Sequence, residues 1–161
     1  MTQAPADAEL TRLVYQEARL IDQGRFEEWY ALFDEDGLYW MPLTPGQQSG
    51  ESEPALMYED KMLLRLRLDR MKDPKAHSLH PAVRCLHVLQ APEVTSRDEA
   101  GGRYALSTPF LYVETQGDAQ QVLAATAEHL VASTPQGLRI KIKKVLLLNC
   151  DAALPAIQLL P

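Results

Sequence analysis

The stretch DAELTRLVYQEARLIDQGRFEEWYALF, residues 7–33, decides the fold because it carries two successive helical patterns. In Asp7–Gln23 the apolar residues recur at steps of three and four, which is typical of a helix with one apolar face. Asp7 can cap the start of this helix, and Gly24 stands where a left-handed residue commonly ends one. A second short helix is predicted over Arg25–Phe33. Its aromatic residues fall on one face at the same spacing: Phe26, Trp29, Tyr30 and Phe33.

Downstream of these helices the pattern changes to a strand and then becomes ambiguous. Gly37–Leu43 is predicted to be a strand that Pro42 and the following turn bring to an end, and residues 44–54 form a polar loop. Ala55–Lys72 alternates like a strand in its middle, but its length and its Leu, Met, Arg and Lys content favour a helix. Charged residues intrude into the apolar arc of that helix, so either the arc is partly exposed or they form ion pairs within the protein or across an interface. They are Asp60, Arg67 and Arg70.

The second half of the chain has the composition of a β-sheet. Short turn signals separate segments rich in Val, Leu, Ile, Tyr and Thr, and links of this length favour antiparallel neighbours. Pro109 has no N–H for a ladder and so marks an edge or a bulge, while Ile140 and Ile142 are predicted to face the core with the bases beside them facing out. The expected fold is α+β, with a strongly curved, mainly antiparallel sheet wrapped around the N-terminal helices. The predicted strands are Val83–Val94, Arg103–Thr115, Gln121–Ser133 and Leu138–Asn149.

Length, charge and cysteine content narrow the class of protein. The chain has 161 residues, which we expect to form a single domain over residues 1–161. Its net charge is −6, from 16 Lys and Arg against 22 Asp and Glu, so we expect no nucleic-acid partner. No apolar run approaches the ~18 residues of a membrane span, so no membrane partner is expected either. Two cysteines, Cys85 and Cys150, are too few for a disulfide framework and indicate reduced thiols in a cytoplasmic protein.

Motifs that bind cofactors or carry catalysis are few. The sequence has no glycine-rich phosphate loop, no Cys-x-x-Cys and no Gly-x-Ser-x-Gly, and its two cysteines build no iron–sulfur cluster from recognisable motifs. His77 and His80 are the nearest thing to a metal-ligand pair, but they stand in a predicted loop without an obvious third ligand. His87 shares a strand face with apolar residues and is interpreted as a hydrogen-bonded core residue, with a general base as the alternative. His129 is interpreted as a cross-strand polar partner.

Residues 13–40, LVYQEARLIDQGRFEEWYALFDEDGLYW, resemble the N-terminal signature of the small (β) subunit of aromatic-ring-hydroxylating oxygenases. The matching positions are Tyr15, Glu17, Ala18, Asp22, Trp29, Leu32, Phe33, Tyr39, Trp40 and Pro42. The resemblance continues in order through Met57–Asp60, Leu63–Arg70, Ser107, Phe110 and Arg139–Asp151, so it covers nearly the whole chain. The chain departs from the family pattern at Pro81–Cys85 and directly after Tyr112.

This resemblance implies a fold, a partner and a division of roles. Small subunits of this family adopt a cone-like α+β fold, similar to ketosteroid isomerase and nuclear transport factor. Three of them usually assemble with three large (α) subunits, which carry the Rieske 2Fe–2S cluster and the mononuclear iron. The chain is therefore expected to be a non-catalytic structural subunit that supports assembly of the large subunit, with no cofactor of its own. The aromatic substrate, and whether one or two oxygen atoms are added, stay open.

Two sets of residues are candidates for the functional site. The charge is unevenly spread, since residues 1–36 hold nine acids against three bases and residues 61–75 hold six bases against two acids. If the chain is a partner subunit, this asymmetry and the intruding charges favour a contact at the end of the first predicted strand, on the following helix and in the 44–54 loop. The interface candidates are Trp40, Pro42, Arg65, Arg67 and Arg70. The alternative is a free-standing cone-fold isomerase or dehydratase, in which a pocket carboxylate or imidazole acts as a base. Its candidate residues are Asp36, Tyr39 and His87, and the fold alone favours neither reading.

Overall fold

The computed structural model describes residues 3–161, which form three α-helices, one short 3₁₀ helix and seven strands. The helices are α1 (Asp7–Asp22), α2 (Phe26–Ala31), α3 (Lys61–Lys72) and the 3₁₀ helix η1 (His77–Leu79). The strands are β1 (Phe33–Pro42), β2 (Ala55–Asp60), β3 (Val83–Leu89), β4 (Glu93–Asp98), β5 (Arg103–Gln116), β6 (Ala119–Thr134) and β7 (Gly137–Leu147). Within this described part of the chain, none of the helices has both the length and the apolarity that crossing a membrane requires.

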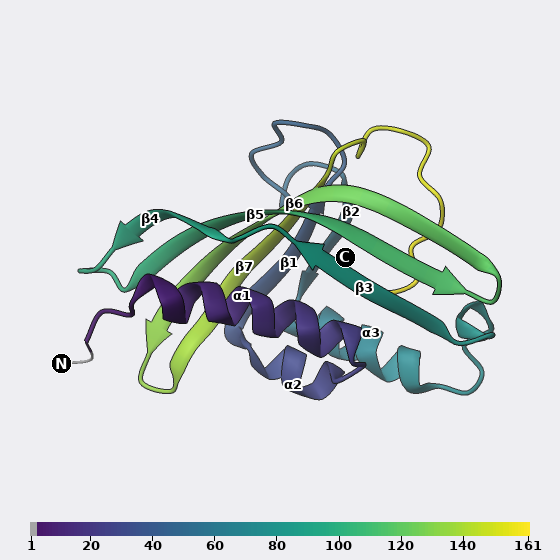
Figure 1. Ribbon diagram of the computed structural model, residues 1–161, viewed down its shortest axis with the longest axis horizontal. Coiled ribbons are helices and arrows are strands. Elements are labelled where there is room, and N and C mark those ends of the chain that lie inside the picture. The colour runs from purple at the N-terminus through teal and green to yellow at the C-terminus, as the bar shows by residue number, and fades with distance from the viewer. Residues whose placement is uncertain (1–2) are drawn as a thin grey trace.

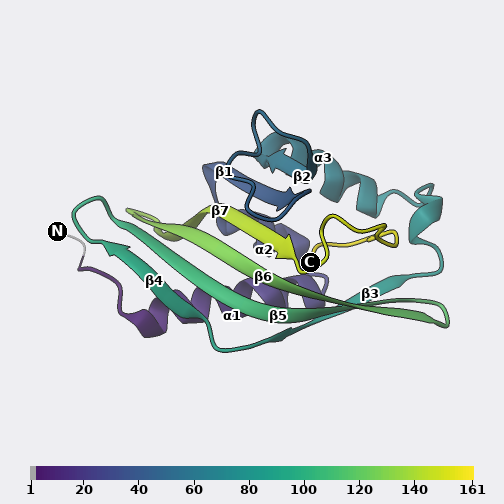
Figure 2. The same cartoon turned by 90° about the horizontal axis from the view of Figure 1, so that it is seen from above.

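All seven strands belong to one sheet, which arches over the helices (Figure 1). The strand order is β2-β1-β7-β6-β5-β3, with β4 as a further partner of β5, and every pairing is antiparallel except that of β1 with β7. We call the helix-covered side of the sheet the inner face and the opposite side the outer face. Figure 2 looks onto the outer face, where no described helix lies in front of β3, β5, β6 or β7. The predicted α+β fold with a curved, mainly antiparallel sheet is confirmed.

The first helix crosses the inner face because its apolar stripe packs into the core. Leu10, Val14 and Ile21 are buried, and α1 contacts β3, β4 and β5. The predicted cap is wrong by one residue: Ala6 precedes the helix and its N–H donates to the Glu9 carboxylate, while Asp7 already lies in the first turn. Gly24 adopts the predicted left-handed conformation just after the helix, with a φ of 68°.

The prediction of one helix over residues 55–72 is wrong in its first part. Ala55–Asp60 forms β2, whose burial alternates residue by residue and which pairs with the free edge of β1. The helix α3 begins at Lys61, and the carboxylate of Asp60 caps it by accepting a hydrogen bond of 2.9 Å from the N–H of Leu63. Helix propensity is a weak prior, and the available sheet edge overrides it.

The predicted strand Val83–Val94 is interrupted and forms two strands, β3 and β4, which both pair with β5. Pro109 lies on β5 at the level of this interruption. β3 pairs with residues 110–116 of β5 and β4 pairs with residues 103–107, so Pro109 falls between the two paired stretches. The missing N–H of the proline therefore falls where no continuous neighbour requires it, which agrees with the predicted irregularity at this position.

A bulge in β7 reverses a predicted side-chain pattern. Two neighbouring residues of β6 pair with Ile140 and Ile142, so Lys141 is an extra residue between them. Because side chains alternate along a strand, this extra residue turns Ile142 away from the inner face and brings Lys143 onto it. The prediction that the bases of this strand all face solvent is therefore wrong for Lys143, which is buried.

Candidate functional site

The inner face holds a buried ionic cluster of four residues from four elements, which we call the inner ionic cluster: Glu17 (α1), Trp29 (α2), His129 (β6) and Lys143 (β7). The ammonium of Lys143 donates to Glu17 Oε1 over 2.7 Å, and the indole N–H of Trp29 donates to the same oxygen over 2.8 Å. His129 Nε2 lies 3.7 Å from Glu17 Oε2, and the three ionisable side chains are at most 2% exposed. Burial disfavours the charged form of the Glu17 carboxylate and so raises its pKa. The interactions with Lys143 and His129 are together stronger than this effect, and the pKa of Glu17 is lowered.

The tail of the chain, residues 153–161, returns beneath the arch and meets this cluster (Figure 1). Leu160 and Pro161 are buried. The carbonyl oxygen of Pro161 accepts hydrogen bonds from Lys143 Nζ, over 3.0 Å, and from the hydroxyl of Tyr39. Burial, and then the charge of Glu17, raise the pKa of Tyr39 well above its usual value, so its hydroxyl stays protonated as a donor.

A second anchor for the tail is the buried carboxylate of Glu114 on β5. It accepts the backbone N–H groups of Gln158 and Leu159 over 3.1 and 2.8 Å. The hydroxyl of Tyr112 and the amide of Gln121 donate to the same carboxylate over 2.7 and 3.1 Å. With four donors this carboxylate is satisfied within the chain, and its role is to hold the tail against the sheet.

His87 on β3 is bonded to Asp22 at the end of α1. Its Nδ1 lies 2.6 Å from Asp22 Oδ1, and its backbone N–H donates to the same carboxylate. The Cys85 thiol is also close, 3.7 Å from Asp22, and burial followed by this carboxylate raises the pKa of Cys85 to about 12. Within residues 3–161 these are the only three potential metal ligands whose atoms all lie within 4.8 Å of one another. Since the thiol is protonated and Asp22 is occupied by His87, the group is a hydrogen-bonded packing contact, as predicted for His87.

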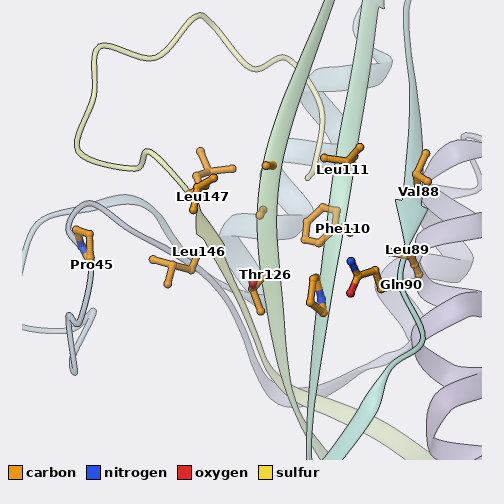
Figure 3. Close-up of a pocket in the computed structure, with 13 residues that line it drawn as sticks. Pro45, Val88, Leu89, Gln90, Phe110, Leu111, Thr126, Leu146 and Leu147 are labelled. Atoms are coloured by element: carbon orange, nitrogen blue, oxygen red, sulfur yellow. The ribbon is translucent and has the colours of Figure 1, made fainter.

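The outer face of the sheet is apolar and exposed to solvent. The exposed fractions of its aliphatic side chains run from 45% to 79%, in Leu86 and Val88 of β3, Leu111 of β5, Val122 of β6 and Leu148 just after β7. We call these residues the outer apolar face. A groove of about 650 Å³ crosses it. Figure 3 shows this groove running from Pro45, in the loop after β1, past Leu146 to Leu111 and Val88. An apolar patch that spans several strands is a typical interaction site.

Comparison with known proteins agrees with this picture. Residues 16–152 match the family model described as ring hydroxylating beta subunit. The chain belongs to this family. It is 32% identical over 111 residues to the benzene 1,2-dioxygenase subunit beta of Pseudomonas putida, a match that covers 64% of this chain and 59% of that subunit. This chain thus aligns with less than two thirds of the length of that curated relative.

Solved structures extend the agreement to the whole fold. The beta subunit of benzoate 1,2-dioxygenase from Burkholderia mallei superposes with a TM-score of 0.77 at 20% identity, covering 99% of this chain and 100% of that one. An NTF2-like protein with a cystatin-like fold from Novosphingobium aromaticivorans superposes with a TM-score of 0.61 at 18% identity, covering 89% of this chain and 82% of that one. These likenesses confirm the predicted cone-like fold.

The iron centres expected of a ring-hydroxylating oxygenase each require a defined set of side-chain ligands at one point. A Rieske cluster requires two thiolates and two imidazoles at one point, and a mononuclear iron site requires two imidazoles and a carboxylate. In the described chain Cys85 lies beside one imidazole and Cys150 belongs to no ligand cluster. His77 is exposed at the start of η1, and His80 is exposed directly after it. The arrangement of these donors fits neither centre.

The residues predicted to form the interface do not make one free surface. Trp40 and Pro42 are buried in the single chain, with Trp40 packed edge-on against Tyr58. Arg65 donates to Glu27 over 2.9 Å, and Arg67 donates to Glu59 over the same distance. Only Arg70 among the five is exposed, whereas Arg65 and Arg67 are half-buried. The intruding charges therefore pair mainly within the chain, which was one of the alternatives.

The residues predicted for an enzymatic pocket are not brought together either. Asp36 is exposed and paired with Lys141, Tyr39 is bonded to Pro161, and His87 is bonded to Asp22. Each of the three side chains therefore has a partner within the chain, and that of Tyr39 is supplied by the tail.

Three residues central to the inner face escaped prediction as site residues. Glu17 has the clearest signal, since it stands on the apolar stripe of α1 at helical spacing. Glu114 and Lys143 have no such signal, because their environments depend on the tail and on the bulge.

Proposed function

We propose that this chain is the non-catalytic small subunit of a multicomponent aromatic-ring-hydroxylating oxygenase, and that it supports assembly of the iron-bearing large subunit. Membership of the family supports this role. The inner face supports it as well, because its acids and bases are bonded to each other, to the tail or to Asp22. No group among them presents a reactive atom to an open pocket lined by the residues of the described inner face.

The observation that carries the proposal is the outer apolar face. Its aliphatic side chains would be covered in an assembly, and the hydrophobic effect would contribute to association in proportion to that area. We assign the large subunit as the occupant. The face is grooved, and a two-fold contact between identical copies would set groove against groove, whereas a protruding segment of a different chain can fill it.

The assembly that fits the family resemblance has three large and three small subunits. In it the Rieske cluster and the mononuclear iron would reside in the large subunits, and hydroxylation of the aromatic ring would take place there. Two unpaired cysteines agree with a reducing compartment, so we place the complex in the cytoplasm.

Co-expression with the large-subunit gene tests the proposal. Size-exclusion chromatography with light scattering should give a heteromer with equal numbers of both chains. Leu111→Lys should abolish it, because the charge would lie at the centre of the contact. Leu66→Lys, on the exposed side of α3, is the matched control and should assemble normally.

Three outcomes would contradict the proposal. Separate species of the two wild-type chains would remove the partner role. A stable homodimer of this chain that Leu111→Lys dissociates would assign the outer apolar face to a second copy instead. Turnover of a small substrate by the isolated, metal-free chain would favour the isomerase or dehydratase reading, which no residue cluster on the inner face supports.

A further inference from the structure

Four buried polar atoms of the inner face have no hydrogen-bond partner among the described residues. They are His87 Nε2, Thr108 Oγ1, and both ring nitrogens of His129, and they make up four of the six such side-chain atoms in residues 3–161. The side chains are nearly inaccessible to solvent. Since buried polar groups in folded proteins are almost always bonded to protein or to ordered water, their concentration in three residues requires an explanation.

All three residues line one small cavity between α1 and the sheet. The cavity has a volume of about 10 Å³, and its walls also include Glu17 and Lys143 of the inner ionic cluster. The three residues come from three adjacent strands, β3, β5 and β6, so the sheet pairing itself brings them to one place. A space of this size accommodates the centre of a single water molecule.

We propose that this cavity is a binding site for one ordered water molecule, held by His87, Thr108 and His129. His87 Nδ1 faces the carboxylate of Asp22 at 2.6 Å, so Nδ1 donates to that carboxylate and Nε2 is left to bond to the water molecule. A water molecule both donates and accepts, so it can bond to His87 Nε2, to one nitrogen of His129 and to the hydroxyl of Thr108. It thereby provides a partner for three of the four atoms, with the three hydrogen bonds that are typical of buried water.

A metal ion does not fit the same place. His87, His129 and Glu17 are the two imidazoles and the carboxylate that a cation would require. Their three donor atoms do not all lie within 4.8 Å of one another, since the only group of three that does so in the described chain is Asp22 with Cys85 and His87. Lys143, whose ammonium lies 2.7 Å from Glu17, would also repel a cation.

The water molecule joins two networks that the side chains leave separate. On one side is the pair of Asp22 and His87, and on the other is the inner ionic cluster with its bond from Lys143 to Pro161. Bridged in this way, the pair at the end of α1 reaches His129, which lies 3.7 Å from the carboxylate of Glu17, so that α1, the sheet and the tail share one polar network. This site is independent of the partner subunit, because it lies wholly within the chain.

Crystal structures of the full chain at a resolution that shows ordered water test the site. We expect a density peak within hydrogen-bond distance of His87 Nε2, Thr108 Oγ1 and His129. Thr108→Ser keeps the hydroxyl and should keep the peak, whereas Thr108→Val, of nearly equal size, should lose it. In the ¹⁵N NMR spectrum the Nε2 signal of His87 should shift in Thr108→Val and stay in place in Thr108→Ser.

Three results would overturn the proposal. One is a wild-type cavity without density, and another is an anomalous peak from a metal ion. The third is a direct hydrogen bond between the three side chains. If Thr108→Val fails to fold, the wild-type density and Thr108→Ser still decide between these outcomes.

Discussion

The inner and outer faces of the sheet place charge and apolar surface in opposite ways. On the inner face Glu17, Lys143 and Glu114 are buried, and each has partners within the chain. On the outer face Leu111 and Val122 are about half exposed, and Leu111 lines an open groove. In an ordinary soluble domain charged side chains are rarely fully buried unless they are paired. The difference teaches that the charges of the inner face are paired within the single chain, whereas the apolar side chains of the outer face stay exposed, which is why we propose the outer face as the contact with another chain.

The sharpest way to break this comparison is to make one substitution on both faces of a single strand. Val131 and Val122 both lie on β6, the first fully buried and the second exposed. Val131→Asp should cost more than about 4 kcal/mol or prevent folding, because it buries an unpaired charge. Val122→Asp should change the free energy of unfolding of the isolated chain by less than about 0.5 kcal/mol. Urea unfolding followed by circular dichroism measures both, and equal effects would refute the assignment of faces.

Removing one partner from the inner ionic cluster should have the next largest effect. Lys143→Met leaves the carboxylate of Glu17 buried without its ammonium and should destabilise the chain by roughly 3–5 kcal/mol. The double variant Glu17→Gln, Lys143→Met removes both charges and should recover most of that loss in the same unfolding experiment. A single variant that unfolds at the wild-type urea concentration would mean that the cluster is not buried in solution.

Removing one anchor of the tail should have an effect of intermediate size on the free energy of unfolding. Glu114→Gln replaces a carboxylate that accepts two backbone N–H groups of the tail, and should cost about 1–3 kcal/mol. Hydrogen exchange should rise at Gln158 and Leu159 more than in the strands. Glu93→Gln, an exposed change on β4, serves as the control and should leave exchange in the tail unaltered. Unchanged protection of the tail in Glu114→Gln would contradict its anchoring role.

The smallest expected effect is the contribution of Glu17 to the pH dependence of the free energy of unfolding. The pKa of Glu17 is lower in the folded chain than in the unfolded chain, so the unfolded chain binds more protons as the pH falls. The contribution of Glu17 is therefore complete above the unfolded value of about 4.3 and is lost progressively below it. Between about pH 5 and pH 2 the wild-type chain should lose stability more steeply than the double variant Glu17→Gln, Lys143→Met. If plots of stability against pH, measured by thermal unfolding, run parallel for the wild-type chain and the double variant, this linkage is excluded.

Much of the fold was predictable, because the deciding signals are local. The apolar stripe of α1, the turn at Gly24 and the strand composition after Val83 each depend on neighbours in sequence. β2 was predicted as a helix, because a six-residue strand gains its stability from the edge of β1, which the local pattern does not contain.

The site was less predictable because its contacts are distant in sequence. Lys143 reaches Glu17 only because the bulge at Lys141 turns it inward, and that bulge is a property of the pairing with β6. The anchoring of the tail by Glu114 depends equally on the final course of the chain. The uneven charge and the intruding charges favoured an interface at Trp40 and Arg67, but they give no information on the partners that bury or pair these residues within the chain.

The most direct test of the central claim is hydroxyl-radical footprinting of this chain, alone and with its large subunit. The labelling of Leu86, Leu111 and Val122 should decrease when the large subunit is added. Met62 and Leu66 on α3 should be labelled as strongly as before. Protection confined to α3, with the outer apolar face still fully labelled in the complex, would contradict the account.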